Sequence, residues 1–225
     1  MSKKRTYNDV CGLAHAMELV GERWALLVIR ELAFGPKRFT DIRSGLPSAS
    51  PNVLSQRLRE LEAVGVLRRR KLAPPAGSWV YELTEWGQAL EPTLRELGRW
   101  AARSPIFPEH GNFSADAMAM SMETMFDPAA AEGVAGLFEV AFGEDRFRVE
   151  IAEGGIDVSR AEAHEPTAII ETTPQAWVGL IYEGRDVGEA EAAGELHITG
   201  DRAQAVVLTG LFALPERVEL EKASA

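Results

Sequence analysis

The sequence predicts two domains: a mainly α N-terminal domain over residues 1–104 and an α+β C-terminal domain over residues 111–225. Apolar residues recur at helical spacing in the first half, whereas short β-branched segments between glycine-containing turns prevail in the second. Pro105, Pro108 and Gly111 interrupt regular structure between the halves. The charge also changes sign there. Residues 1–104 hold 17 of the 24 Lys and Arg but 11 of the 34 Asp and Glu, a net charge of +6 that leaves −16 for the rest.

The composition excludes several classes of protein. The chain has 225 residues, of which 46% are hydrophobic and 26% charged, as in globular rather than disordered proteins. Its single cysteine, Cys11, excludes an intramolecular disulfide. With only four histidines besides, little material is left for a zinc site, and we expect neither a metal nor another cofactor. No apolar run approaches the roughly 18 residues that span a bilayer, so we expect a cytoplasmic protein with no membrane partner.

Four helices are expected before residue 65. Each has apolar residues at helical spacing and ends near a glycine or a proline. Their expected bounds are about Asp9–Leu19, Trp24–Phe34, Phe39–Leu46 and Pro51–Val64. Ser50 is a good N-cap for the last of them, and Pro51 suits its first turn.

The helix over Pro51–Val64 is expected to bury one face and to present a polar one. The residues expected to be buried are Val53, Leu54, Leu58, Leu61 and Val64. The residues expected to point outward are Asn52, Ser55, Gln56, Arg57 and Arg59. The major groove of DNA admits one α-helix, and there Asn and Gln can pair with adenine and Arg with guanine.

A basic β-hairpin is expected after this helix. Its strands are Val66–Leu72 and Trp79–Leu83, joined by a turn over residues 74–78. The first strand carries Arg68, Arg69, Arg70 and Lys71, which could lie beside the DNA backbone or the minor groove. Thr84 is expected to cap one last helix, whose apolar residues are Trp86, Leu90, Leu94, Leu97 and Trp100.

Helix, turn, helix and basic hairpin in this order predict a winged helix-turn-helix, which binds double-stranded DNA. The residues expected to contact DNA are Ser50, Asn52, Ser55, Gln56, Arg57, Arg59, Arg68, Arg69, Arg70 and Lys71. The positive net charge of this half agrees with a polyanionic partner. Two other interpretations stay open: the basic residues form an ordinary solvated surface, or the winged helix binds another protein.

Residues 7–102 resemble the HxlR family of bacterial winged-helix transcriptional regulators. The matching segments are Cys11, Gly21–Trp24, Phe39–Ile42, Leu54–Leu61, Gly65–Leu67 and Tyr81–Gly87. The resemblance implies a homodimer in which the first and last helices of the domain pair across the two-fold axis and the two recognition helices read an inverted repeat. The residues assigned to this contact are Leu13, Leu90, Leu94, Leu97 and Trp100. The alternative is that this apolar stripe packs only within its own domain.

The resemblance also makes Cys11 a candidate redox sensor, because some relatives sense oxidants or electrophiles through a cysteine at this position. Reactivity requires an exposed thiol with a lowered pKa. If the segment is helical, His15 favours the thiolate whereas Asp9 opposes it. The alternative is an inert, buried cysteine that acts as a small hydrophobic residue.

The second half is expected to start with a Met-rich helix and to continue as a small sheet with further helices. Three strands of an antiparallel meander are expected at Leu137–Phe142, Arg146–Ile151 and Gly155–Ser159. Two more strands, at Thr167–Thr173 and Leu196–Thr199, should flank a helix that starts at Pro174. An apolar helix over Ala203–Leu214 should be buried on most sides or line a pocket.

From about Asp116 to Leu214 this half resembles the sterol-carrier-protein-type lipid-binding domain. The matching segments are Arg146–Ile151, Gly155–Val158, Ala168–Pro174, Trp177–Gly184 and Gly194–Asp201. The resemblance implies a sheet with helices packed on it and an apolar tunnel for an acyl or sterol-like ligand. Candidate pocket residues are Met118, Met122, Trp177, Leu180, Val207 and Leu211, and plain core packing is their alternative role. Polar groups that could orient a ligand are Thr172, Gln175, Tyr182, His197 and Thr209.

The sequence as a whole predicts a two-domain transcriptional regulator. It would bind operator DNA as a homodimer, and its acidic C-terminal domain would either modulate this binding through a hydrophobic ligand or shape the dimer. An enzyme is not expected, because the sequence has no GxSxG, P-loop, GxGxxG or HExxH motif. The alternative is a carrier of lipids or other hydrophobic metabolites whose winged helix mediates protein contacts.

Overall fold

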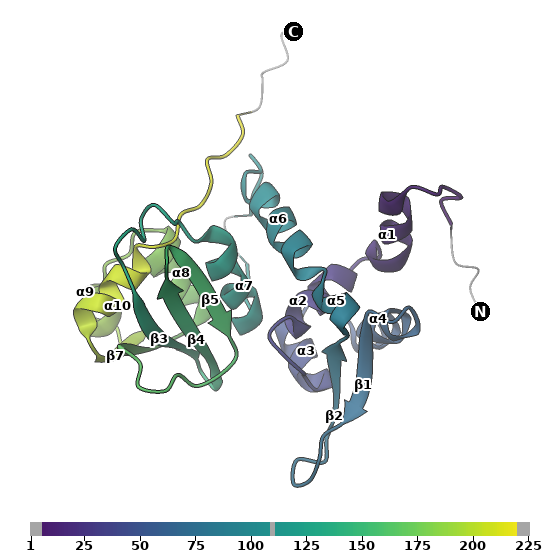
Figure 1. Cartoon of the computed structure of the whole chain (residues 1–225), viewed down its shortest axis with the longest axis horizontal. Coiled ribbons are helices and arrows are strands. Elements are labelled where there is room, and N and C mark those ends of the chain that lie inside the picture. The colour runs from purple at the N-terminus through teal and green to yellow at the C-terminus, as the bar shows by residue number, and fades with distance from the viewer. Residues whose placement is uncertain (1–5, 109–110, 220–225) are drawn as a thin grey trace. The chain divides into compact units, whose positions relative to one another are not determined.

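The computed structural model describes residues 6–108 and 111–219 (Figure 1). The chain divides into two compact units between Leu94 and Arg95. This division falls inside helix α6 (Glu91–Ala102), not in the proline-containing segment, of which residues 109 and 110 lie outside the described part. The outer limits that the sequence suggested, residues 1 and 225, lie outside it as well. The functional limits near residues 104 and 111 therefore stay a prediction.

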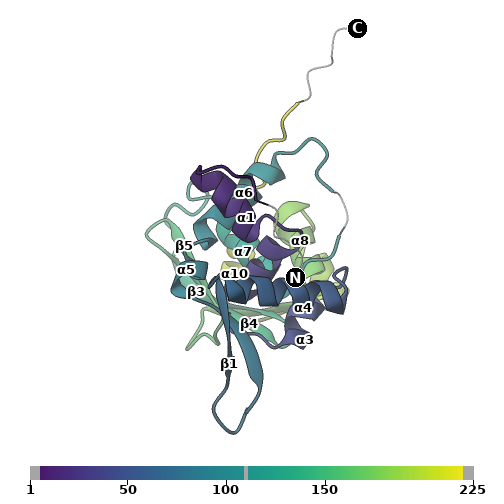
Figure 2. The same cartoon turned by 90° about the vertical axis from the view of Figure 1, so that its right-hand side faces the viewer.

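The first unit has the expected order of helices followed by a hairpin. Its elements are α1 (Gly12–Val20), α2 (Ala25–Leu32), α3 (Phe39–Gly45), α4 (Pro51–Ala63), β1 (Leu67–Lys71), β2 (Trp79–Leu83), α5 (Glu85–Gln88) and the start of α6. Apolar side chains from α2, α3 and α4 form its core, with Val28, Ile29, Ile42, Leu54 and Leu58 fully buried. The antiparallel hairpin projects beyond the helices of this unit (Figures 1 and 2). The first unit is therefore a winged helix-turn-helix.

The side chains expected to cap two helices do so. The Ser50 hydroxyl accepts the Val53 N–H at the start of α4, and the Thr84 hydroxyl accepts the Gly87 N–H at the start of α5. The single helix expected after Thr84 is instead two, because α5 ends at Gln88 and α6 begins at Glu91. The first helix is also shorter than expected, since α1 begins only at Gly12.

Two glycines allow close approaches that position these elements. A Cβ atom at Gly87 would lie 2.0 Å from the backbone oxygen of Val66, so α5 can rest against the start of β1 only without a side chain there. A Cβ atom at Gly45 would lie 2.0 Å from the carboxylate of Glu31. Glu31 is fully buried and pairs with Lys37 at 3.1 Å, so the second glycine makes room for a buried charge.

The second unit is an α+β domain with one five-stranded sheet. Its elements after α6 are α7 (Ala115–Met125), β3 (Gly136–Phe142), β4 (Asp145–Ala152), β5 (Gly155–Ser159), β6 (Ala168–Thr172), α8 (Pro174–Tyr182), α9 (Val187–Ala192), β7 (Leu196–Gly200) and α10 (Arg202–Thr209). The strand order is β5-β4-β3-β6-β7. β3, β4 and β5 form the expected antiparallel meander, while β6 pairs parallel with β3 and antiparallel with β7. Among the described residues, no helix is long and apolar enough to cross a membrane.

Two helices of this unit differ from the expectation. The short helix α9 was not expected, because its segment is rich in Ala and Glu and has no apolar stripe. Helix α10 ends at Thr209, not at Leu214, and it is not buried on most sides. Val206 and Val207 are 37% and 39% exposed, so only one side of α10, through Ala205 and Leu208, packs on the domain.

The two faces of the sheet differ in chemistry. One face carries buried apolar side chains, which include Phe138, Val140, Phe147, Val149 and Ile170. The other face carries alternating charges, and Arg146 there pairs with Glu139 and Glu171. Such alternation is typical of a sheet covered by helices on one face only. Met118, Met122 and Trp177, from helices α7 and α8, are fully buried in the same core.

A cluster of charges joins α7 to the sheet. The Asp116 carboxylate is fully buried and lies 2.6 Å from the Arg160 guanidinium. Arg160 also pairs with Asp145, and its guanidinium lies 4.7 Å from the centre of the Phe147 ring. Because a buried carboxylate is costly unless a cation compensates it, Arg160 is expected to stabilise this unit.

We predict that Arg160→Met destabilises the second unit by about 3 kcal/mol, because the buried Asp116 carboxylate loses its compensating cation. Urea unfolding of the full chain measures this change. Arg148→Met is the matched control, since the partners of Arg148, Glu150 and Asp157, are 45% and 67% exposed. Such surface pairs contribute at most about 1 kcal/mol. Equal losses in the two variants would contradict the prediction.

Candidate functional site

Helix α4 presents a polar surface opposite its buried face. Leu54, Leu58 and Leu61 are buried against the core of the first unit. The other side of the helix exposes Asn52, Gln56 and Arg59, with Ser55 half-buried and the cap residue Ser50 exposed. The Gln56 side-chain amide donates to Glu60 at 3.0 Å. The exposed side chains of α4 therefore carry both hydrogen-bond donors and acceptors and a cation.

Two residues of α4 do not lie where the sequence suggested. Arg57 was expected to point outward, but it is only 8% exposed. Its guanidinium pairs with Glu60 one turn along the helix, and lies 3.6 Å from Glu22. Arginine can bury its aliphatic stem while its charged end finds a partner, so its polarity alone did not predict exposure. Val53, expected to be buried, is 37% exposed.

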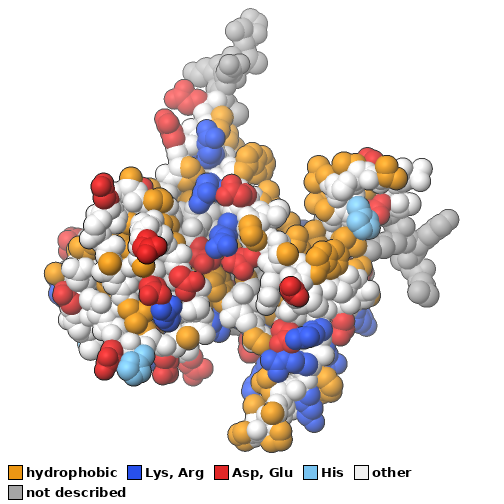
Figure 3. All heavy atoms as spheres, in the orientation of Figure 1, with side chains coloured by type: hydrophobic (Ala, Val, Ile, Leu, Met, Phe, Trp, Pro, Cys, Tyr) orange, Lys and Arg blue, Asp and Glu red, His pale blue; other side chains and the backbone are white. Residues whose placement is uncertain are grey.

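The wing, defined here as β1, the turn and β2 (residues 67–83), places its basic side chains on two faces. Arg68 and Arg70 both donate to the Glu82 carboxylate, at 2.6 and 2.5 Å. Arg69 instead lies over aromatic rings, 4.6 Å from the centre of Trp79 and 5.9 Å from that of Tyr81. Lys71 is exposed. Lys and Arg side chains gather over the wing, whereas its tip is apolar (Figure 3).

The charge state of Glu82 follows from its neighbours. Burial raises the pKa of its carboxyl, but the hydrogen bonds and charges of Arg70 and Arg68 outweigh burial and leave the pKa below its ordinary value. Glu82 is therefore ionised at neutral pH and neutralises part of the wing's positive charge.

The five residues assigned to a dimer contact fall into two groups. Leu90 and Leu94 are partly buried against the core of the first unit, so the alternative of packing within their own domain holds for them in part. Leu13, Leu97 and Trp100 are 70%, 44% and 73% exposed. Among the described residues, nothing packs over these three large apolar side chains of α1 and α6 to bury them.

Cys11 is exposed and lies at the N-cap of α1. The backbone N–H groups of Ala14 and then Leu13, at the start of α1, lower the pKa of its thiol. The neighbours suggested by the sequence act differently. Asp9 accepts the Cys11 backbone N–H at 2.9 Å, and His15 lies 3.8 Å from the Glu18 carboxylate. The helix start, and not His15, therefore favours the thiolate.

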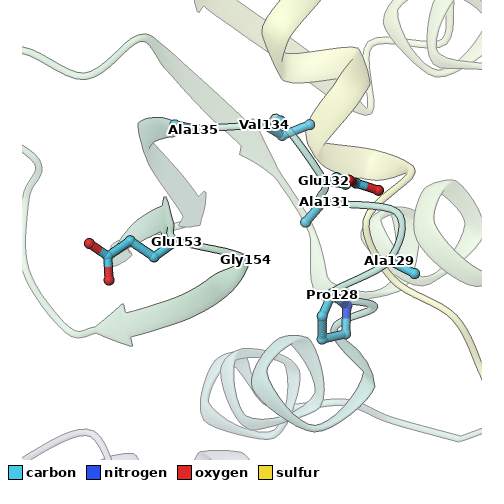
Figure 4. A pocket seen from close by; sticks show the side chains of 9 residues that line it. Pro128, Ala129, Ala131, Glu132, Val134, Ala135, Glu153 and Gly154 are labelled. Carbon is cyan, nitrogen blue, oxygen red and sulfur yellow. The ribbon is translucent and has the colours of Figure 1, made fainter.

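Five of the six candidate pocket residues of the second unit are buried, and the sixth is exposed. Met118, Met122, Trp177, Leu180 and Leu211 are buried in the core, whereas Val207 is exposed. A hollow of about 500 Å³ lies elsewhere, between the segment 128–135 and the β4–β5 turn (Figure 4). The side chains of Glu132 and Glu153 point away from its centre in this view. Its wall has no polar side chain directed inward that would orient a ligand.

Two polar groups lie within this core. The Tyr182 hydroxyl lies 2.8 Å from the Ser121 hydroxyl, and burial raises the Tyr182 pKa to about 12. The indole N–H of Trp177 is buried and has no hydrogen-bond partner in the described structure. A buried donor without a partner is uncommon in proteins and marks Trp177 as a position where a ligand acceptor could bind.

Comparisons with known proteins find a different family for each half of the chain. The family model of the HxlR-like helix-turn-helix matches residues 19–105, and that of the SCP-2 sterol transfer family matches residues 123–213. The uncharacterised HTH-type transcriptional regulator YvaP of Bacillus subtilis is 40% identical over 86 residues, which cover 38% of this chain and 80% of YvaP. The HTH-type transcriptional regulator YodB of the same species is 38% identical over 95 residues, which cover 42% of this chain and 85% of YodB.

Solved structures of such regulators match a similar share of the chain. The redox regulator HypR in its oxidised form is 31% identical, with a TM-score of 0.38, over 40% of this chain and 94% of HypR. Quinone-bound YodB from B. subtilis is 37% identical, with a TM-score of 0.35, over 40% of this chain and 93% of YodB.

We predict that the Cys11 thiol is alkylated by iodoacetamide with a pH profile whose midpoint lies below that of an ordinary cysteine, because only the thiolate reacts. The rate measured against pH reports one group, since the chain has one cysteine. The same chain unfolded in urea is the control, because unfolding removes the ordered N–H groups of Ala14 and Leu13 from the thiol. Equal midpoints in the folded and unfolded chain would show that the helix start does not activate the thiol.

Proposed function

Because the chain belongs to the HxlR-like helix-turn-helix family of transcriptional regulators, we propose that it binds operator DNA through α4 and the wing. The observation that carries this proposal is the arrangement of the first unit. The capped helix α4 exposes Asn52, Gln56 and Arg59, and the basic wing follows it directly in the chain. Side chains of these types read base edges in the major groove, while cations of the wing bind phosphates.

The roles within α4 follow from exposure. Asn52 and Gln56 are exposed and can pair with adenine, and Arg59 can pair with guanine or a phosphate. The backbone N–H of Asn52 at the start of α4 can bind a phosphate, whereas Pro51 has no N–H and that of Val53 donates to the Ser50 cap. Arg57 is left out of this set, because Glu60 and Glu22 hold its guanidinium.

We further propose that the chain acts as a homodimer. Leu13 on α1 and Leu97 and Trp100 on α6 are apolar and exposed, and burying them in a two-fold contact would remove apolar surface from water. A symmetric dimer presents two α4 helices, which suits an inverted-repeat operator. Leu90 and Leu94 contribute mainly to the core of their own unit, so the proposed contact is narrower than the whole apolar stripe.

We also propose that oxidants or electrophiles regulate the protein by reacting with the Cys11 thiol. Its exposure and its lowered pKa are the two properties that such a role requires. HypR is a redox regulator, and YodB has been solved with a bound quinone. With one cysteine per chain, oxidation would lead to a disulfide between subunits or to an adduct with a small molecule.

For the second unit we propose a hydrophobic ligand that carries a hydrogen-bond acceptor. The match to the SCP-2 sterol transfer family supports a lipid-like ligand, and the buried Trp177 N–H supports the acceptor. Because Met118, Met122 and Leu211 are packed in the core, ligand entry would require this core to open. Such a ligand would regulate DNA binding only if it bound the DNA-competent and the incompetent states with different affinities.

The first prediction of this proposal concerns sequence preference. The full chain should select a preferred sequence from a random duplex library, and Gln56→Ala should cost about 1–3 kcal/mol on it and relax one base position. Arg57→Ala, one residue away, should instead lower the melting temperature, because its buried stem and ion pairs are lost. If no duplex is selected even at low salt, the regulator proposal is wrong and the carrier alternative becomes the better one.

The second prediction concerns assembly. Leu97→Asp and Trp100→Asp should each convert the dimer to a monomer, because a charge would be buried in an apolar contact. Val206→Asp is the matched control, since Val206 is an exposed apolar residue of α10 and lies outside the proposed contact. Sedimentation equilibrium at micromolar concentration measures the mass. A monomeric wild-type chain would remove the two-fold model.

The third prediction concerns the ligand. Palmitic acid should raise the melting temperature of the second unit in a concentration-dependent way, because a ligand that binds only the folded state stabilises it by mass action. Trp177→Phe keeps the ring but removes the N–H donor, so it should reduce the shift. Calorimetry of the full chain measures both. The absence of a shift with palmitic acid, a sterol and an aromatic compound would leave the second unit without this role.

A further inference from the structure

The basic residues on the two faces of the wing have different kinds of partner. β1 and β2 pair so that Arg68 lies opposite Glu82, and Arg69 lies opposite Tyr81. Because side chains alternate along a strand, Arg68 and Arg70 share one face with Glu82, and Arg69 and Lys71 share the other face with the aromatic residues. One face is therefore neutralised by a carboxylate, and the other is not.

The carboxylate on the first face is fixed in place. The Glu82 side chain is 11% exposed, whereas its partners Arg68 and Arg70 are 66% and 43% exposed. Each carboxylate oxygen accepts a hydrogen bond from the Nε of a different arginine, so both cations are directed toward one buried anion. A charge-assisted hydrogen bond of this kind is stronger than a neutral one, and the Glu82 charge offsets part of the positive charge that Arg68 and Arg70 present to a phosphate.

The arginine on the second face has a different partner. The Arg69 guanidinium lies over the rings of Trp79 and Tyr81 in a cation–π contact. The guanidinium has five N–H donors, and a contact of this kind does not pair them with the oxygen of an acidic side chain. Arg69 is thus held in position by the rings while its donors remain able to bind a phosphate. The exposed Lys71 lies on the same face.

We infer that Glu82 limits the sequence-independent affinity of the wing for DNA by holding Arg68 and Arg70, and that Arg69 is the main phosphate-binding residue of the wing. This inference rests on the proposed DNA binding. Contacts to phosphates add affinity for every sequence alike, whereas base contacts of α4 add it only on the operator. Because Glu82 reduces the contribution of Arg68 and Arg70 to phosphate binding, it raises the ratio of operator affinity to non-specific DNA affinity.

The test compares four full-length chains on a random-sequence DNA duplex. Fluorescence anisotropy at a series of salt concentrations gives the slope of log affinity against log salt, whose magnitude rises by about 0.9 for each phosphate contact. Arg69→Ala should reduce the slope by about one such contact, while the double variant R68A/R70A should leave it nearly unchanged. Glu82→Gln should steepen the slope and raise the affinity, because the released arginines can reach phosphates.

A second comparison isolates the role of Glu82. Glu82→Gln in the R68A/R70A background should bring no gain in affinity, because the cations that it would release are absent. Circular dichroism checks the fold of each variant, because R68A/R70A leaves the buried Glu82 carboxylate without these two cations. If Glu82→Gln does not fold, the comparison of R69A with a folded R68A/R70A still decides between the two faces.

The outcomes are separable. A loss in R68A/R70A as large as that in R69A would overturn the assignment of Arg69. A folded Glu82→Gln chain with an unchanged slope, or a gain that persists in the R68A/R70A background, would overturn the role of Glu82. Failure of the wild-type chain to bind the duplex at low salt would overturn the proposed function itself, and the inference with it.

Discussion

Pairing between guanidinium and carboxylate groups is the interaction on which both units depend. In the second unit, Arg160 compensates the buried Asp116 and so ties α7 to the sheet. In the first unit, the same chemistry decides which cations stay available, because Glu60 and Glu22 hold Arg57 and Glu82 holds two arginines of the wing. A count of basic residues therefore overstates the positive surface that a polyanion meets. The available cations are set by the carboxylates that the fold brings beside them.

The order of elements in the first unit could be predicted from the sequence because its signals are local. Ser50 and Pro51 mark the start of α4, and Thr84 marks the start of α5, through contacts within three residues. The exposure of Arg57 could not be predicted in this way, since Glu22 comes from a distant part of the chain. The same holds for the wing, where the hydrogen bonds of Arg68 and Arg70 depend on the strand register.

In the second unit the strands were predictable, whereas the helices and the pocket were less so. Alternating apolar residues and glycine turns located β3, β4 and β5. Helix α9 has no apolar stripe, but its N-cap Asp186, which accepts the Glu189 N–H, was a signal that could have found it. The pocket stays a prediction, since neither apolar composition nor the burial of Met118, Met122 and Trp177 distinguishes the wall of a cavity from a close-packed interior.

A side chain at Gly45 or at Gly87 would clash with a neighbouring atom, and the two positions differ in whether a second substitution could relieve the clash. At Gly45 the conflicting atom would belong to the Glu31 side chain, so a smaller residue at position 31 could accommodate a larger one at 45. At Gly87 the conflicting atom is the backbone oxygen of Val66, which every amino acid possesses. No exchange at position 66 can remove it. A side chain at 87 therefore has no single compensating substitution at its contact partner, and lineages that lose this glycine must rebuild the path of the backbone itself.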